Sequence, residues 1–462
     1  MTLLGNSVDS PEKGVIILGA GEVGFNIAER LARDGRQVVL VDRNRKRLQA
    51  VQTQLDVQTL YGSVVSPAVL NQAGLERAEA VIAVTNSDEV NLLACLIANS
   101  GNPAPVKLAR IRNDELASLR EIMGPDLLNL RAVINPDAEV VKSIETMIAL
   151  PRAVDYGEFG EGRIKILAVE ILAGPLIGKT LAHFPDVTPD RGLRVGGILR
   201  RERLMIPQAG EIFQAGDVVY FVCLEESMAT VLAITGTETP PVRYITIVGG
   251  GDIGLRLAEG LDKRDLRIKL IDSNEKRCVF LAGRLSNAAV LVGDGTDRRF
   301  MLGENIGGSD MTIALTGDEE TNILICLLAK SLGCPNTITR VNKNAYMPIV
   351  RAIGLRLSVN PRLAASNSVI RFLRRGLRLS SLATQDENVE MLEGALRDGS
   401  ELLDKPIRNL AFPAGINLLA VVRGDEAFIP RGDTILKAGD CLTLLCDRTR
   451  LAWVGSSLLG RK

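Results

Sequence analysis

The sequence has few of the residue types that mark several common classes of site. Of its 462 residues, one is histidine and 3% are aromatic. A single histidine, with no Cys-x-x-Cys spacing, argues against a metal centre. The scarcity of aromatics leaves little material for stacking unpaired bases. Lysine plus arginine equals aspartate plus glutamate at 55 each, so no net field favours nucleic acid.

The cysteines show no disulfide framework. Seven are scattered along the chain, at Cys95, Cys223, Cys278, Cys326, Cys334, Cys441 and Cys446. The last two are the closest pair, and they stand in an apolar run that indicates a strand. We therefore expect reduced, mostly buried thiols, as in a cytosolic protein.

The N-terminus and the apolar runs lead to the same expectation. Residues 1–12 lack the basic start and apolar core of a secretory signal. No apolar run approaches the roughly 18 residues that cross a bilayer. The composition, with 46% hydrophobic and 24% charged residues, is that of a soluble globular protein. We expect a soluble, cytoplasmic chain.

What the sequence does contain is a glycine-rich turn between a strand and a helix. The apolar run Val15–Leu18 predicts a buried strand, and Gly19, Gly21 and Gly24 follow at the G-x-G-x-x-G spacing. The first glycine allows a tight turn, the second lets the backbone approach a pyrophosphate, and the third permits close helix–strand packing. Asp42 ends the next predicted strand, where a carboxylate can accept hydrogen bonds from ribose hydroxyls. The stretch predicts a dinucleotide-binding lobe.

The same pattern occurs a second time. Gly249, Gly251 and Gly254 repeat the glycine spacing, and Asp272 follows them as Asp42 follows the first set. Gly249 and Asp272 each lie 230 positions after their first-half counterparts. The sequence therefore predicts two tandem halves.

Strands and helices alternate through the rest of each glycine-rich lobe. The first half predicts the strands 57–61, 80–84, 106–111 and 132–134 and the helices 44–55 and 67–73, with a further helix that Asp88 is placed to cap. The second half repeats these landmarks. Such alternation predicts a doubly wound parallel sheet, which binds ligands at the carboxyl ends of its strands.

A smaller strand-rich module follows each of these lobes. A connecting helix over 139–150 leads to strands over 164–172, 193–199 and 218–223, with a short helix near 178–182. The last hundred residues repeat the pattern in strands over 416–422 and 441–446. The second connector, 364–379, predicts a longer, basic helix with Arg371, Arg374, Arg375 and Arg378. Residues 236–242 and 380–388 are the candidate linkers.

These motifs together resemble the TrkA family, the peripheral subunits of bacterial Trk potassium-uptake systems. The resemblance rests on GAGEVG with Asp42, on IAVTNSDEVN and IALTGDEETN, on LARIRN, and on the late turns Gly216-Asp217 and Gly439-Asp440. It implies an α/β fold of two tandem Rossmann-like doubly wound parallel sheets, each followed by a small α+β RCK C-terminal lobe. The implied bounds are 13–135 and 242–361 for the Rossmann lobes, and 136–237 and 362–455 for the connecting helices with C-terminal lobes.

The resemblance also implies a function. The chain would form a homo-oligomeric ring on the cytosolic face of the inner membrane, beneath a potassium-translocating subunit of the TrkH/TrkG type. NAD(H), with ATP and ADP as further candidates, would bind the Rossmann lobes and gate that pore, without catalysis, metal or nucleic acid. The implied first-site residues are Gly19, Ala20, Gly21, Glu22, Val23, Asp42, Thr85, Asn86 and Arg110. The implied second-site residues are Gly249, Gly250, Gly251, Asp252, Ile253, Asp272, Thr316, Gly317 and Arg340.

Several residues allow a plainer reading. Either glycine loop could be a packing feature without a ligand, and the two aspartates could be solvated strand-end acids. Arg43 beside Asp42 could accept a 2′-phosphate, which weakens the preference for NAD over NADP. Arg110 and Arg340 suit phosphate, an intersubunit pair or solvent.

Further alternatives concern the sites' charge and the protein's class. Glu22 and Asp252 would repel phosphate if they pointed inward, and Ser63 stands where the second half has Asp294. His183 and the arginine run fit surface positions, with lipid or partner contact as the run's alternative. An NAD-dependent oxidoreductase is the main rival function, but no convergent acid–base cluster is visible. A redox-sensing DNA regulator would need a basic helix-turn-helix, which the sequence lacks.

Overall fold

The computed structural model contains two compact units. It describes residues 14–33, 35–117, 129–151, 153–201, 203–235, 241–343, 346–373, 377–379 and 389–459. The first unit comprises the described residues up to Val140 together with Asn360–Leu373, and the second comprises Val141–Val359 with the described part of the chain after Leu373.

The first unit contains a six-stranded parallel sheet in the order β3-β2-β1-β4-β5-β6. Its strands are β1 Val15–Leu18, β2 Val38–Asp42, β3 Gln58–Tyr61, β4 Ala80–Ala83, β5 Val106–Arg110 and β6 Leu130–Ile134. Its helices are α1 Glu22–Arg33, α2 Arg45–Gln54, α3 Pro67–Gln72 and α4 Asp88–Gly101, followed by the connecting helix α6 Pro136–Ala149. Strands β1 and β4 are buried along their whole length, which explains their continuous apolar runs.

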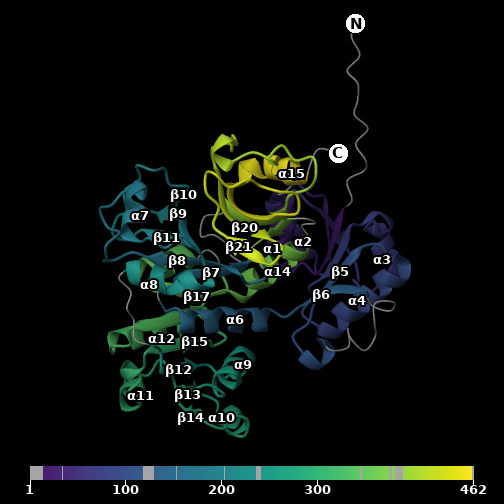
Figure 1. Cartoon of the computed structure of the whole chain (residues 1–462). Helices are drawn as coiled ribbons and strands as arrows, with labels where there is room; N and C mark the ends of the chain where they lie inside the picture. Colours follow the sequence, from purple (N-terminus) through teal and green to yellow (C-terminus); the bar gives the residue numbers. More distant parts are fainter. Residues whose placement is uncertain are drawn as a thin grey trace. The chain divides into compact units, whose positions relative to one another are not determined.

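The second unit begins its own Rossmann-like lobe at β12 and repeats the same sheet, in the order β14-β13-β12-β15-β16-β17 (Figure 1). The strands are β12 Tyr244–Val248, β13 Arg267–Asp272, β14 Ala289–Val292, β15 Met311–Ala314, β16 Asn336–Arg340 and β17 Leu357–Val359. The helices are α9 Asp252–Leu261, α10 Glu275–Ala282, α11 Arg298–Gly303, α12 Glu319–Ser331 and α13 Met347–Ala352. Both sheets confirm the predicted doubly wound parallel fold.

Each C-terminal lobe is a five-stranded antiparallel sheet with short helices. The first has the order β10-β9-β11-β8-β7, and the second repeats it as β21-β20-β22-β19-β18. The first lobe contains β7 Ala153–Phe159, β8 Ile164–Glu170, α7 Phe184–Val187, β9 Leu193–Arg200, β10 Arg203–Met205, β11 Val218–Leu224 and α8 Met228–Ile234. The second contains β18 Leu377–Leu379, β19 Val389–Ala395, β20 Ile416–Arg423, β21 Glu426–Phe428, β22 Cys441–Asp447 and α15 Leu451–Leu459.

The two C-terminal lobes share one hydrophobic core within the second unit. Ile166 and Tyr220 of the first lobe belong to the same buried cluster as Leu419 and Leu445 of the second. Glycine makes the close approach possible, since a Cβ on Gly196 would lie 3.1 Å from Leu419 Cδ2. Both faces of β8 and β11 are therefore covered, one by their own lobe and one by the other.

The Gly-Asp turns close each C-terminal sheet. Gly216 and Gly439 adopt φ values of +88° and +87°, which glycine tolerates and other residues rarely do. The aspartate that follows is buried and accepts a bidentate pair from an arginine, with Arg200 donating to Asp217 and Arg423 to Asp440 at 2.7 and 2.8 Å. The turns are thus structural clasps between two strands of one sheet.

A helix from the second half of the chain packs on the first Rossmann-like sheet. Helix α14 Pro361–Leu373 lies along α1 within the first unit, and Figure 1 shows the two helices side by side. Arg30 of α1 donates to Asn367 of α14 at 2.9 Å. In the second unit, Glu145 of α6 accepts a bond at 2.7 Å from Arg264, which follows α9, and lies next to Gly260 within that helix. A connecting helix from one half therefore contacts the first helix of the other half's sheet.

Three local predictions are wrong. Ser87, not Asp88, caps α4 by accepting from the backbone N–H of Val90, because Asp88 is already inside the helix. The short helix expected near 178–182 begins later, with a 3-10 turn at Leu181–His183 that leads into α7. The second connector is not the longer helix, since α14 has 13 residues against 14 in α6 and the strand β18 follows it.

The remaining segment predictions fall partly outside the described residues. The leader 1–12, most of both linkers, Arg374 and Arg375, and the side chains of Arg371 and Arg378 lie there. None of the helices among the described residues is long and apolar enough to cross a membrane. The lobe bounds remain predictions.

Candidate functional site

Each glycine loop has three glycines with three separate roles. Gly19 and Gly249 adopt φ values of +116° and +109°, which turn the chain from strand into helix. A Cβ on Gly24 or Gly254 would overlap the carbonyl oxygen of the first glycine, so α1 and α9 can approach only without a side chain there.

The middle glycine is different, because a Cβ on Gly21 or Gly251 would meet no atom within 4 Å. The chain itself therefore does not require glycine at this position. The space over it is open beside the first turn of the helix, whose N–H groups have no intrahelical acceptor. This geometry suits a diphosphate.

Asp42 and Asp272, the aspartates predicted to bind ribose, lie at the ends of their strands and also accept hydrogen bonds from the backbone of the glycine loops. One oxygen of Asp42 accepts from the N–H of Ala20 at 2.7 Å, and the other accepts from the N–H of Asn44 at 2.8 Å. Asp272 bonds Gly250 and Asn274 in the same way, at 2.7 and 2.9 Å. A carboxylate oxygen can accept more than one bond, so this role is compatible with ribose binding.

A buried asparagine, which the sequence motifs did not single out, joins the ends of two neighbouring strands in each lobe, β4 with β5 and β15 with β16. The side-chain oxygen of Asn91 accepts from the N–H and hydroxyl of Thr85 at 2.9 and 2.7 Å, and its amide donates to the carbonyl of Arg110 at 2.8 Å. Asn322 makes the corresponding bonds with Thr316 and Arg340. The pair, here called the clasp asparagines, thus brings together predicted site residues from two strands.

A sequence signal for the clasp asparagines existed. Each is a polar residue inside an apolar helix, and each ends one of the two quoted motifs. Asn86 and Gly317 lie exposed beside the held threonines.

The acid that follows each cap fixes the next loop. Asp88 accepts from the backbone N–H groups of Arg112 and Asn113 at 2.8 and 2.9 Å. Glu319 accepts from those of Asn342 and Lys343 at 2.8 and 3.0 Å. The acid that was expected to cap the helix thus anchors the loop after the neighbouring strand.

Arg110 is buried at the carboxyl end of β5 with a partly unsatisfied guanidinium. It is 7% exposed, its Nη1 reaches the carbonyl of Thr85 only at 3.5 Å, and its Nε has no hydrogen-bond partner among the described residues. Burial lowers the pKa of Arg110, and neighbouring Arg112 adds to the effect. A buried cation in this state favours an anionic ligand. Arg340 lies at the same place in β16, half-buried.

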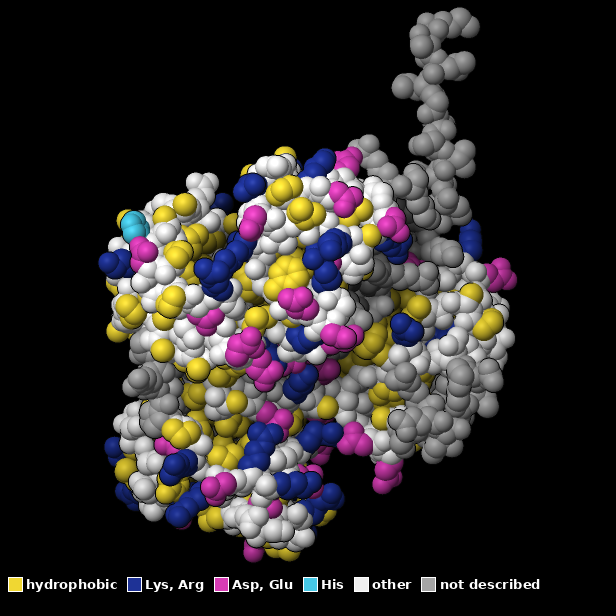
Figure 2. Space-filling model, in the orientation of Figure 1, with side chains coloured by type: hydrophobic (Ala, Val, Ile, Leu, Met, Phe, Trp, Pro, Cys, Tyr) yellow, Lys and Arg dark blue, Asp and Glu magenta, His cyan; other side chains and the backbone are white. Residues whose placement is uncertain are grey.

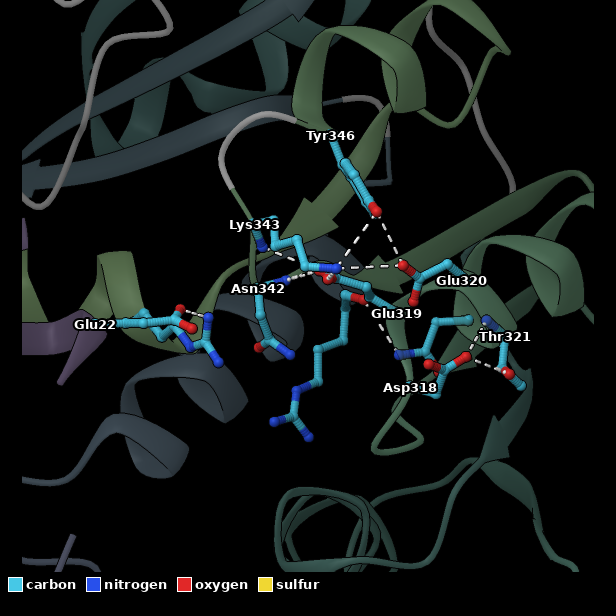
Figure 3. A network of polar contacts seen from close by, with 11 residues as sticks. Glu22, Asp318, Glu319, Glu320, Thr321, Asn342, Lys343 and Tyr346 are labelled. Atoms are coloured by element: carbon cyan, nitrogen blue, oxygen red, sulfur yellow. Dashed lines mark hydrogen bonds and ion pairs between the residues drawn. The ribbon is translucent and has the colours of Figure 1, made fainter. Parts of the chain in front are cut away.

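The two loops differ in the partner of their acidic residue. Glu22 and Asp252 are both exposed, with 61% and 90% of their side chains accessible. Glu22 forms an ion pair with Arg362 of α14, and Figure 3 labels Glu22 and marks a contact of its carboxylate with a dashed line. Asp252 lies 3.7 Å from Arg277, which belongs to the same lobe and donates from Nε to the carbonyl of Gly250 at 2.6 Å.

The second lobe also has an ion-pair network beside its strand ends. The Lys343 ammonium lies 2.7 Å from Glu319 and 3.3 Å from Glu320, whose carboxylate also accepts from the Tyr346 hydroxyl (Figure 3). Burial would raise the pKa of Glu319, but bonds from the Lys343 ammonium and from two backbone N–H groups outweigh it and hold that pKa below its usual value. In the first lobe Asn113 occupies the position of Lys343.

The remaining predicted residues have plain positions. Val23 and Ile253 are buried in the helix–sheet core, so only their backbone faces the loop. Arg43 is exposed. Asp294 forms a local turn with Thr296, and these bonds lower its pKa. His183 contacts the Thr180 hydroxyl at 2.6 Å in an exposed turn.

The described surface carries charges of both signs, and its acidic, histidine and cysteine side chains are dispersed. Basic and acidic side chains are intermixed on the face in Figure 2, in line with the equal numbers of each in the sequence. No group of three or more His, Cys, Asp or Glu side chains among the described residues could hold a metal ion. The seven cysteines are free, and burial raises the pKa of Cys95, Cys223 and Cys326 to about 12.

The fold and the paired loops define a tandem protein of two Rossmann-like domains, each followed by a small C-terminal domain. The TrkA-N domain family model matches residues 15–136 and 245–361, and the TrkA-C domain model matches 166–236 and 391–454. A Trk system potassium uptake protein TrkA from Azorhizobium caulinodans is 36% identical over 437 residues, which cover 93% of this chain and 95% of that protein. The chain belongs to the TrkA family of Trk-system potassium uptake proteins.

Further comparisons agree on family and fold. A Trk system potassium uptake protein TrkA from Halomonas elongata is 34% identical, covering 95% of this chain and 96% of that protein. The solved GsuK RCK domain superposes with a TM-score of 0.61 at 20% identity, covering 98% and 96% of the two chains. The GsuK channel bound to NAD superposes with a TM-score of 0.62 at 21% identity, covering 98% of this chain and 80% of that one.

Proposed function

We propose that this chain is a regulatory subunit that binds NAD(H) or adenine nucleotides and gates a membrane potassium-uptake transporter. The observation that carries the proposal is the open space at Gly21 and Gly251, each beside a strand-end aspartate and a free helix start. A glycine that the chain does not need for its own packing indicates a ligand.

The relatives support the transport role. The family members named above are described as Trk system potassium uptake proteins rather than as enzymes. Two structures of similar fold are described as a GsuK channel bound to NAD and as GsuK bound to ADP. The proposed partner is a potassium-translocating membrane subunit, and the proposed assembly is a homo-oligomeric ring on the cytosolic face of the membrane.

Gating requires the nucleotide to bind one ring shape better than another. A tenfold preference supplies about 1.4 kcal/mol per site. Several sites in one ring would add toward the roughly 5.5 kcal/mol that inverts a 1:99 population. Two sites in each chain therefore suit a regulator.

The test is titration of the purified chain with NADH, NAD, ATP and ADP, for wild type, Asp42→Ala and Asp272→Ala. We expect each variant to weaken at least one nucleotide tenfold or more, because each removes the acceptor for ribose hydroxyls. If neither variant weakens any ligand, the assigned sites are wrong.

The second step measures potassium flux after co-purification with the membrane subunit, with and without nucleotide. We expect nucleotide to change the flux. Turnover of NADH with a small substrate would instead favour an oxidoreductase.

A further inference from the structure

The first loop is contacted by a charged residue from the other half of the chain. Arg362 is the second residue of α14, and Glu22 is the first residue of α1. Their ion pair lies at the loop, and the bond from Arg30 to Asn367 holds the same two helices together further along. The arginine therefore reaches the loop from a fixed helix.

Glu22 occupies a position where the protein favours negative charge. The start of a helix carries partial positive charge, and an arginine guanidinium adds a full charge beside it. The Glu22 carboxylate thus stands where a phosphate oxygen would also be stabilised. The planar guanidinium can bind carboxylate or phosphate through two parallel N–H bonds.

The charged guanidinium of Arg362 would be stabilised by an anion bound beside it. Its side chain is 31% exposed, and burial lowers its pKa, because its charged form has lost part of its water. Glu22 is more exposed, at 61%, so it can turn into solvent at little cost.

The second loop lacks this arrangement. Asp252 is 90% exposed, and it lies 3.7 Å from the guanidinium of Arg277 of α10. That cation comes from the second lobe itself and is already bonded to the loop carbonyl of Gly250. Among the described residues, the cation paired with the loop acid comes from a connecting helix of the other half at the first loop and from the same lobe at the second.

We propose that Arg362 is a phosphate-binding residue of the first site, and that a ligand phosphate displaces Glu22 from it. The preferred class is a nucleoside di- or triphosphate, whose terminal phosphate carries more charge than the bridging pyrophosphate of a dinucleotide. A nucleotide bound at the first site would then contact α14 directly. Along the chain, α14 is followed by β18 of the last lobe. This inference rests on the proposed function, because it needs a nucleotide in the first site.

The test compares Glu22→Gln, Arg362→Gln and Arg362→Lys in the full-length chain, with ADP, ATP and NADH as probes. Arg362→Gln should weaken the binding of ADP and ATP at least fivefold and the binding of NADH less than twofold. Arg362→Lys, which keeps the charge but loses the planar fork, should lie between it and wild type. Glu22→Gln should strengthen the binding of ADP and ATP about threefold, since the competing carboxylate is gone.

Glu29→Gln is the matched control, because Glu29 pairs with Arg33 on the exposed part of the same helix at 2.6 Å. It should bind like wild type. Hydrogen exchange provides a second measurement: ADP should slow exchange in residues 361–373 of wild type but not of Arg362→Gln.

The outcomes separate the two proposals. If wild type binds no nucleotide, the proposed function fails. If wild type binds ADP and Arg362→Gln binds it equally well, with the same melting temperature, this inference alone is overturned.

Discussion

The first and second Rossmann-like lobes share the aspartate and asparagine bonds that hold the loop but differ in the side chains around it. Both have an aspartate that bonds the loop backbone, a clasp asparagine and a glycine over open space. They differ in charge partners: the first loop faces Arg362, and the second has Arg277 and the Lys343 network. The shared contacts position backbone, whereas the differing contacts set charge, so we expect both lobes to bind a nucleotide with different preferences.

The largest expected effect tests what the lobes share. Replacing Asn91 by Ala should cost about 3 kcal/mol, because the half-buried N–H of Thr85 and the buried carbonyl of Arg110 lose their partner. Asn322→Ala should cost a similar amount. Denaturant melts of the two variants measure this.

The aspartate variants sharpen that test. Asn91→Asp and Asn322→Asp keep the side-chain size but place an oxygen against two backbone carbonyls. They should be at least as destabilising as alanine. If the Asn91 variants or the Asn322 variants unfolded at the same denaturant concentration as wild type, the stabilising role of the clasp asparagines would be contradicted.

The next effect tests a difference in packing. Gly250 packs against Leu281, and a Cβ there would overlap that side chain, whereas the first lobe has Ala20 and Val51 at the two corresponding positions. Gly250→Ala should therefore cost about 1–3 kcal/mol through overpacking.

Adding Leu281→Val should recover most of the loss, since the pair then matches the first lobe. Thermal melting of the two single variants and the double variant measures the coupling, which should reach at least about 0.5 kcal/mol. If the two effects were strictly additive, the side chains at positions 250 and 281 would not compete for the same space, which would contradict this explanation.

The smallest expected effect is the loss of stability at low pH that comes from Glu319. The pKa of Glu319 is lowered in the folded chain, so its contribution is fully present above the unfolded value of about 4.3 and is lost as pH falls through the folded value. Glu319→Gln should cost about 1 kcal/mol at pH 7, because Lys343 is half-exposed. The difference from wild type should shrink below about pH 4. Melting temperatures across that range check it, and a constant difference would contradict the pKa assignment.

The sequence was sufficient for the features that depend on local chemistry. Apolar runs such as Val15–Leu18 and the glycine spacing determine the parallel sheets and loops directly. Four edge strands were missed, because they are short or carry polar residues, as in β7 with Asp155 and Glu158. Edge positions need no continuous apolar run.

The site was predictable only in part, for a physical reason. The loop glycines and strand-end aspartates follow each other closely in sequence, so spacing identifies them. The clasp asparagines act through bonds to distant backbone, and a polar residue within a helix is usually solvated. The pairing of Glu22 with Arg362 depends on which helix packs on α1, which no local pattern encodes.

The most direct measurement uses Gly21→Ala and Gly251→Ala, singly and together. A Cβ at either position meets no atom of the chain within 4 Å, so each variant should melt like wild type without ligand. Calorimetric titration with NADH and ADP should show each single variant losing binding at its own lobe, and the double variant losing all of it. A double variant that binds both nucleotides like wild type would contradict the account.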